Sequence, residues 1–114
     1  PEQNVTARDV IGALQQLLER GHAHGLRVML GTITPTLGCP DCGGEQGEAI
    51  RQAVNEWIRR AKVFDAIADF DRAVRDPLQP VRLKPEFDSG DHLHPSDAGY
   101  VAMANAIDLG LFRR

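Results

Sequence analysis

One near-continuous apolar run, LRVMLGTITP at residues 26–35, constrains the fold of this chain more than any other feature. Its β-branched residues and its proline stop are typical of a strand. A strand that is apolar on both faces favours a parallel sheet covered by helices over a half-exposed antiparallel one. The run VFDAIADF at residues 63–70 is a second strand candidate. We therefore expect an α/β fold with a parallel sheet.

Three stretches with helical periodicity surround these strands, at residues 5–24, 47–61 and 96–109. Apolar residues recur in each at the spacing of one helix face. The residues predicted to face inward are Val10, Ile11, Leu14, Leu17 and Leu18, then Ala49, Ile50, Ala53, Val54, Trp57, Ile58 and Ala61, and then Tyr100, Met103, Ala104 and Ile107. Thr6 and Asp9 have the spacing of a capping box at the start of the first helix. Loops are expected at residues 36–46 and 73–80, which are rich in turn-forming residues.

Two buried strands are too few for a complete sheet, because they leave unpaired edges and uncovered apolar faces. The 114 residues suit one small domain and leave no room for two. We therefore expect residues 1–114 to form the C-terminal portion of a single, larger doubly wound domain. Its exposed edges favour pairing with the missing N-terminal half or with a second copy, so a homo-oligomer stays open.

The bulk composition excludes some classes of partner. The net charge is −3 and the arginines are scattered, which argues against nucleic-acid binding. No apolar run approaches the roughly 18 residues that a membrane helix needs, so we expect a soluble chain. Residue 1 is proline, and the chain is expected to begin partway through a longer or processed protein. Any targeting segment would lie upstream, so the compartment is undetermined; a secreted or periplasmic protein stays open.

The stretch GDHLHPSDAGY, residues 90–100, holds a candidate acid–base pair. Asp91 and His94 are three residues apart, and side chains at this spacing can meet in a tight turn. A carboxylate that accepts from the imidazole Nδ1–H fixes the tautomer and leaves Nε2 free to take a proton. The alternative is that both residues only cap and decorate the start of a helix. Ser96 and Asp97 are interpreted as the cap and first turn of that helix.

The longer stretch DSGDHLHPSDAGYVAMANAID closely resembles the last conserved block of the SGNH (GDSL-type) esterases and lipases. Upstream, VTARDVIGALQQLLERGHAHGLRVMLGTITP and EAIRQAVNEWIRRAKVFDAIADFDRAVRD resemble the helix and strand pairs that precede this block in the family. The resemblance covers essentially the whole chain and corresponds to the C-terminal half of such an enzyme. It implies part of a three-layer α/β/α, flavodoxin-like domain with a parallel sheet.

The resemblance also implies roles for residues. Asp91 matches the acid and His94 the general base of a Ser-His-Asp triad that hydrolyses carboxylic esters through an acyl-enzyme. The family's Gly-Asp-Ser nucleophile block and its oxyanion glycine and asparagine have no counterpart here. The two serines of the chain, Ser89 and Ser96, are poor candidates. We therefore expect the isolated chain to be inactive. No metal or organic cofactor is implied, and the ester stays open between acylated carbohydrates, short acyl esters and lipids.

Other functions remain as alternatives at this point. Cys39, Cys42, His92 and His94 are four ligands of the kind that zinc prefers, although His-x-His is not the usual zinc-finger spacing. Cys39 or Cys42 could also be the nucleophile of a self-contained cysteine hydrolase with His94 as its base. The two cysteines could equally form a loop disulfide or stay as idle thiols. A non-catalytic interaction fragment is the last alternative.

Overall fold

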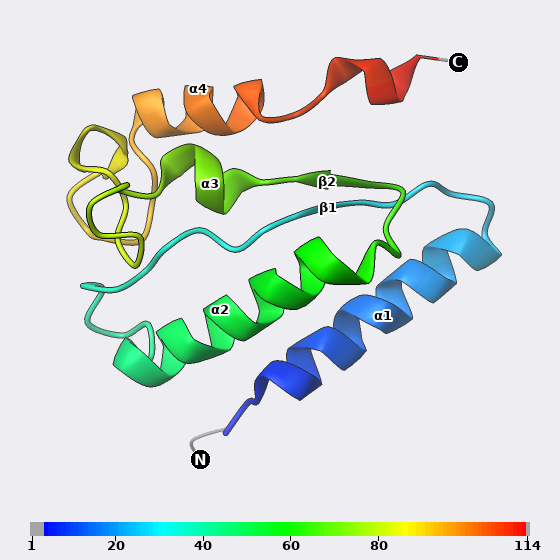
Figure 1. The fold of residues 1–114 in the computed structure, drawn as a ribbon, viewed down its shortest axis with the longest axis horizontal. Helices are drawn as coiled ribbons and strands as arrows, with labels where there is room; N and C mark the ends of the chain where they lie inside the picture. Colours follow the sequence, from blue (N-terminus) through cyan, green and yellow to red (C-terminus); the bar gives the residue numbers. More distant parts are fainter. Residues whose placement is uncertain (1–3, 114) are drawn as a thin grey trace.

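The computed structural model of the protein describes residues 4–113, and its helices and strands follow the predicted order with three short additions. The elements are α1 (Ala7–Ala23), β1 (Met29–Gly31), α2 (Gly44–Ala61), β2 (Ala66–Ala68), α3 (Phe70–Val74), the 3-10 helix η1 (Pro85–Phe87), α4 (Asp97–Asn105) and the 3-10 helix η2 (Leu109–Phe112). The additions are α3, η1 and η2. Figure 1 shows α1 and α2 on one side of the strands, and α4 with η2 on the other side.

The two strands pair in parallel, as the apolar runs predict, and α2 provides the crossover between them. The paired residues are Met29 with Ala66, Leu30 with Ile67 and Gly31 with Ala68. Within residues 4–113, β1 has no strand on its other side. Helices on both sides of a parallel sheet confirm the α/β class.

Both strands are shorter than predicted at both ends, and at their carboxyl ends side chains form the bonds that replace strand pairing. Asp69 follows β2 directly, and its side chain accepts a hydrogen bond from the N–H of Arg72 at 3.2 Å, which starts α3. Beyond β1, the N–H and C=O of Ile33 bond to the side-chain amide of Asn55, both at 2.8 Å. These side chains satisfy backbone groups that a longer strand would pair with a neighbour.

The ends of α1 agree with the sequence prediction. Thr6 Oγ1 accepts from the N–H of Asp9 at 3.2 Å, and Asp9 Oδ2 accepts from the N–H of Thr6 at 2.9 Å, which confirms the capping box. The helix ends at Ala23, and Gly25 follows with a φ of 72°, a conformation that favours glycine. Of the helices in residues 4–113, none is long and apolar enough to cross a membrane.

The core confirms only part of the predicted inward faces. The buried apolar residues are Leu18, Val54, Ile58, Ala68, Val74 and Leu83. On α2, Ala49 and Ala53 are exposed, because polar residues occupy the neighbouring buried positions. On α4, Tyr100 and Ala104 are exposed, because the helix packs through Gly99 instead. A Cβ on Gly99 would lie 2.7 Å from the C=O of Phe87, so only glycine permits this approach.

A buried polar network ties the carboxyl end of β1 to α2 and α3. The Arg51 guanidinium donates to Glu48 at 2.6 and 2.7 Å, to Asp71 at 2.7 Å and to the C=O of Ile33 at 3.0 Å. Arg59 joins the same network through Asp71 at 2.7 Å. Charges this deep are tolerated because each has ionic or hydrogen-bonding partners. The network therefore fixes α3 against α2.

Backbone contacts at the end of α3 hold the segment that leads into the last helix. The N–H of Lys84 donates to the C=O of Val74 at 2.9 Å, and Arg75 forms an isolated antiparallel bridge with Leu83. The chain then passes through η1 to residue 88. The following loop is thus held at the carboxyl-end side of the sheet, where parallel α/β folds place their sites.

Candidate active site

The acid–base loop, residues 88–96, is closed at its neck by backbone bonds. Asp88 and Pro95 form an isolated antiparallel bridge, and the N–H of Ser89 donates to the C=O of His94 at 3.0 Å. Gly90 has a φ of 112°, which only glycine adopts without strain. These bonds hold the two ends of the loop together, and residues 90–94 form the turn between them.

Ser96 anchors the loop to α4, as predicted. Its hydroxyl accepts from the N–H of Gly99 at 3.2 Å and donates to the C=O of Glu86 at 2.8 Å. The N–H of Ser96 donates to the C=O of Phe87 at 2.8 Å. Ser96 therefore has the role of a helix cap and a loop anchor, and its hydroxyl is engaged away from the histidines.

The structure brings Asp91 and His94 into contact, as their spacing predicts. Asp91 Oδ2 lies 2.6 Å from His94 Nδ1, and Asp91 Oδ1 accepts from the N–H groups of Leu93 at 2.9 Å and His94 at 2.8 Å. The His94 ring, then the N–H groups of His94 and Leu93, hold the pKa of Asp91 well below its usual range. The carboxyl is therefore ionised at neutral pH.

This protonation state decides what the imidazole can do. An ionised carboxylate only accepts hydrogen bonds, so the short contact puts the proton of neutral His94 on Nδ1. Nε2 is then left with a lone pair that can accept a proton. The His94 side chain is 64% exposed and that of Asp91 50%, so the pair is accessible to a reacting group. The arrangement can act as a general base.

Neither serine of the chain is placed as a nucleophile for this base. The Ser89 hydroxyl donates to Asp91 Oδ1 at 3.0 Å, on the carboxylate rather than across the imidazole. Ser96 is held by its capping bonds. Within residues 4–113, the site therefore contains an aspartate–histidine pair with no serine hydroxyl hydrogen-bonded to the His94 ring.

A second aspartate–histidine pair lies in the same loop, and sequence reasoning missed it. Asp88 Oδ2 lies 2.6 Å from His92 Nδ1, and Asp88 Oδ1 accepts from the N–H groups of Gly90 at 2.8 Å and His92 at 3.0 Å. Burial opposes ionisation of Asp88, but the bonds from Gly90 and His92 outweigh it and lower its pKa. The signal was present in the sequence as an aspartate four residues before a histidine.

His92 borders an open hollow of about 370 Å³ beside the loop. The hollow is lined mainly by polar side chains; its lining is Asp76, Gln79, Arg82, Leu83, Pro85, Asp88, Gly90 and His92. The segment after β1 also reaches this side of the loop. Arg82 Nη1 donates to the C=O of Leu37 at 3.3 Å, and a Cβ on Gly38 would lie 3.2 Å from His92 Cγ. The position of His92 is thus determined by neighbours on several segments.

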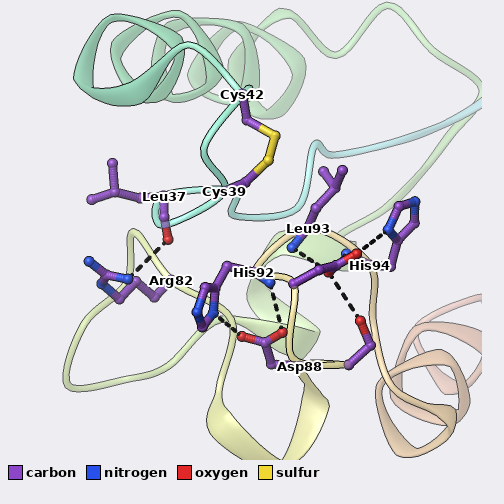
Figure 2. The surroundings of a disulfide bond; sticks show 10 residues. Leu37, Cys39, Cys42, Arg82, Asp88, His92, Leu93 and His94 are labelled. Atoms are coloured by element: carbon purple, nitrogen blue, oxygen red, sulfur yellow. Dashed lines mark hydrogen bonds and ion pairs between the residues drawn. A yellow bond between two sulfur atoms is a disulfide. The ribbon is translucent and has the colours of Figure 1, made fainter.

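Cys39 and Cys42 form a disulfide in this segment, one of the outcomes that the sequence left open. Figure 2 shows it close to the acid–base loop, with the rings of His92 and His94 directed to opposite sides. Zinc binding and cysteine nucleophilicity both require free thiolates, which the disulfide does not provide. Within residues 4–113, no group of three or more His, Cys, Asp or Glu side chains could hold a metal ion. The zinc and cysteine-hydrolase hypotheses therefore lack support in this form of the protein.

Comparison with known proteins gives the family of the chain. Residues 2–102 match the GDSL-like Lipase/Acylhydrolase family. The fold is similar to that of a GDSL-like lipase from Bacteroides thetaiotaomicron, with a TM-score of 0.72 and 15% sequence identity. The similarity covers 97% of this chain and 55% of that chain, so this chain spans little more than half of the lipase's length. No curated protein matches the chain. The resemblance seen in the sequence is confirmed, and the chain belongs to the GDSL-like lipase/acylhydrolase family of hydrolases.

Proposed function

We propose that the protein hydrolyses carboxylic esters through an acyl-enzyme, with His94 as the general base and acid and Asp91 as the residue that orients it. The observation that carries the proposal is the 2.6 Å contact between Asp91 Oδ2 and His94 Nδ1, which leaves Nε2 free on an exposed loop. Membership of a lipase and acylhydrolase family supports the same reaction class.

In this mechanism, a serine hydroxyl attacks the ester carbonyl while His94 Nε2 takes its proton. Asp91 holds the ring and stabilises the imidazolium that forms. His94 then gives the proton to the leaving alcohol and activates a water molecule that hydrolyses the acyl-enzyme. Donors that stabilise the oxyanion contribute roughly 3–4 kcal/mol each in comparable sites. The ester is an acylated carbohydrate, a short acyl ester or a lipid.

The serine and the oxyanion donors are proposed to come from sequence outside these 114 residues. Two observations support this: the hydroxyls of Ser89 and Ser96 are hydrogen-bonded to Asp91 and to the C=O of Glu86 rather than to the His94 ring, and the chain spans 55% of the similar lipase. Residues 1–114 are then the C-terminal portion of one domain. The N-terminal portion would be its closest partner, along the free side of β1.

The test is hydrolysis of an activated acetate ester by the complete protein and by the 114-residue chain, each beside its His94→Ala version. We expect the complete protein to be active and His94→Ala to lower kcat by about 10⁴-fold or more. The 114-residue chain should not exceed the buffer rate. His24→Ala is the matched control, because His24 is an exposed histidine at the end of α1.

Each opposite result is informative. Activity of the 114-residue chain that His94→Ala removes would place the nucleophile within these residues, and Cys39, Cys42 and Ser89 would be the next to change. Full activity of His94→Ala in the complete protein would exclude His94 as the base. A complete protein without hydrolytic activity would favour a non-catalytic interaction role.

A further inference from the structure

The acid–base loop holds two aspartate–histidine pairs, and the proposed mechanism uses only one of them. The pairs make the same kinds of contact, although Asp88 and His92 are four residues apart and Asp91 and His94 three. In each, Oδ2 of the aspartate lies 2.6 Å from the ring Nδ1, and Oδ1 accepts from two backbone N–H groups. They differ in exposure: the side chain of Asp88 is 11% exposed and that of Asp91 is 50% exposed. Asp88 is therefore the more buried of the two aspartates.

His92 belongs to the first pair and lies between the two members of the second pair in the sequence. Its backbone conformation is unfavourable. Its φ of 62° lies in the left-handed region, which is unfavourable for a residue with a side chain. Such a conformation persists only where its surroundings enforce it. Asp88 enforces it twice, because it accepts from the backbone N–H of His92 and from the ring.

The conformation of His92 decides where the next residues point. The N–H groups of Leu93 and His94 follow directly, and both donate to Asp91 Oδ1. A change of φ at residue 92 would turn these donors away from Asp91. It would also move the His94 ring relative to any reacting group. The contacts of Asp88 are thus transmitted through the backbone to the acid–base pair.

We propose that Asp88 and His92 are positioning residues, and that their pair holds the left-handed turn from which Asp91 and His94 are presented. This inference rests on the proposed ester hydrolysis, because it assigns the pair a part in that reaction. Preorganisation of this kind acts on kcat, since a displacement of about 1 Å at the reacting centre can cost about 10²-fold in rate.

The test is Asp88→Ala in the complete protein, with Asp76→Ala as the matched control. Asp76 also lines the hollow and accepts a backbone N–H, that of Leu78 at 2.8 Å, but it makes no bond to the acid–base loop. We expect Asp88→Ala to lower kcat by about 10- to 100-fold with an unchanged KM. Asp76→Ala should keep the kcat of the unchanged protein. Asp88→Asn should recover part of the loss, because its amide oxygen still accepts from Gly90 and His92.

A proton NMR measurement gives a readout that a general loss of stability would not produce. The protons held between each ring Nδ1 and its aspartate should give two resonances far downfield. Asp88→Ala should remove that of His92 and broaden that of His94, at a thermal midpoint within a few degrees of the unchanged protein. Asp76→Ala should keep both.

Two results would overturn the positioning role. One is an unchanged kcat in Asp88→Ala while His94→Ala abolishes hydrolysis, which would leave the proposed function intact. The other is an equal loss of kcat in Asp88→Ala and Asp76→Ala. If His94→Ala itself keeps full activity, the proposed function fails, and the positioning role fails with it.

Discussion

The buried network between α2 and α3 and the exposed acid–base loop are built from similar contacts in opposite surroundings. Arg51 and Asp71 meet at 2.7 Å with side chains 3% and 1% exposed. His94 and Asp91 meet at 2.6 Å with side chains 64% and 50% exposed. The buried pair joins α2 to α3 across the fold, whereas the exposed pair lies within four consecutive residues.

The same contact therefore has different consequences. Removing one partner of a buried pair leaves a charge without solvent or counterion, and typically costs 3–5 kcal/mol. An exposed pair adds only about 0–1 kcal/mol to stability, because water solvates both groups. Its atoms remain accessible, and its value lies in the orientation that it gives to the imidazole. The buried network maintains the fold, and the exposed pair is suited to chemistry.

The largest effect that would separate the two regions is expected from Asp91→Asn in the complete protein. The amide can still accept backbone bonds, but it no longer favours the Nδ1–H tautomer of His94 or stabilises the imidazolium. We expect kcat to fall by about 10⁴-fold and the free energy of unfolding to change little, because water solvates both groups. Ester hydrolysis and urea unfolding measure the two quantities. A large loss of stability would show that the loop also maintains the fold.

Arg51→Ala tests the buried side of the comparison. It leaves the buried Glu48 without its counterion, whereas Asp71 keeps Arg59 and Arg75, and we expect the free energy of unfolding to fall by about 3–5 kcal/mol. Arg60→Ala is the control: its contact with Glu56 is 3.1 Å, with side chains 80% and 59% exposed, and it should change stability by at most about 0.5 kcal/mol. Equal effects of the two variants in urea unfolding would contradict the role given to the network.

The disulfide lies in the segment that leads from β1 into α2, close to the acid–base loop (Figure 2). Its removal is expected to have an effect on stability between those of the buried network and of the exposed pair. Cys39 and Cys42 close a very short loop, so the constraint on the unfolded chain is small. We expect the double variant Cys39→Ser with Cys42→Ser to lose about 2 kcal/mol in urea unfolding. The unchanged protein under reducing conditions is the control and should show a similar loss. A loss as large as that of Arg51→Ala would mean that the disulfide also organises α2.

The smallest effect concerns pH and the edge of the buried network. Burial opposes ionisation of Asp69, but Arg59, the N–H of Arg72 and the Thr32 hydroxyl outweigh it and lower its pKa to about 2. The folded state thus favours the ionised form. This contribution is complete above about pH 4, the pKa of an unfolded aspartate, and is lost as the pH falls towards 2. Asp69→Asn should flatten the decline of the thermal midpoint in this range, and an unchanged slope would contradict it.

The predictable parts of this protein depend on neighbours in the sequence. The capping box at Thr6, the cap at Ser96 and the contact between Asp91 and His94 each join residues three positions apart. Their geometry follows from local backbone conformation, so residue types and spacing suffice to predict them. The order of helices and strands follows in the same way from hydrophobic periodicity.

The errors concern residues whose partners are distant in the sequence. Arg51 and Asn55 have the polar character of an exposed helix face, but they are buried because Asp71 and the backbone of Ile33 satisfy them. Glu48 is buried beside them as the ion-pair partner of Arg51. Periodicity therefore placed Val54 and Ile58 correctly in the core, but it assigned Ala49 and Ala53 to the buried face in place of these polar residues. On α4, the contact between Gly99 and the C=O of Phe87 rotated the buried face in the same manner.

The sequence by itself determined the class of the fold, the parallel pairing of the strands, the family resemblance and the acid–base pair. Periodicity, caps and short spacings are local, and they do not depend on how the elements pack. Only the tertiary structure decided that polar residues complete the buried face of α2, that Cys39 and Cys42 are joined, and that Asp88 holds His92 in a left-handed turn. The buried polar residues of α2 depend on partners from β1 and α3, which meet them only in the folded chain. The disulfide and the Asp88–His92 contact join residues three and four positions apart, but spacing alone left other outcomes open for these residues.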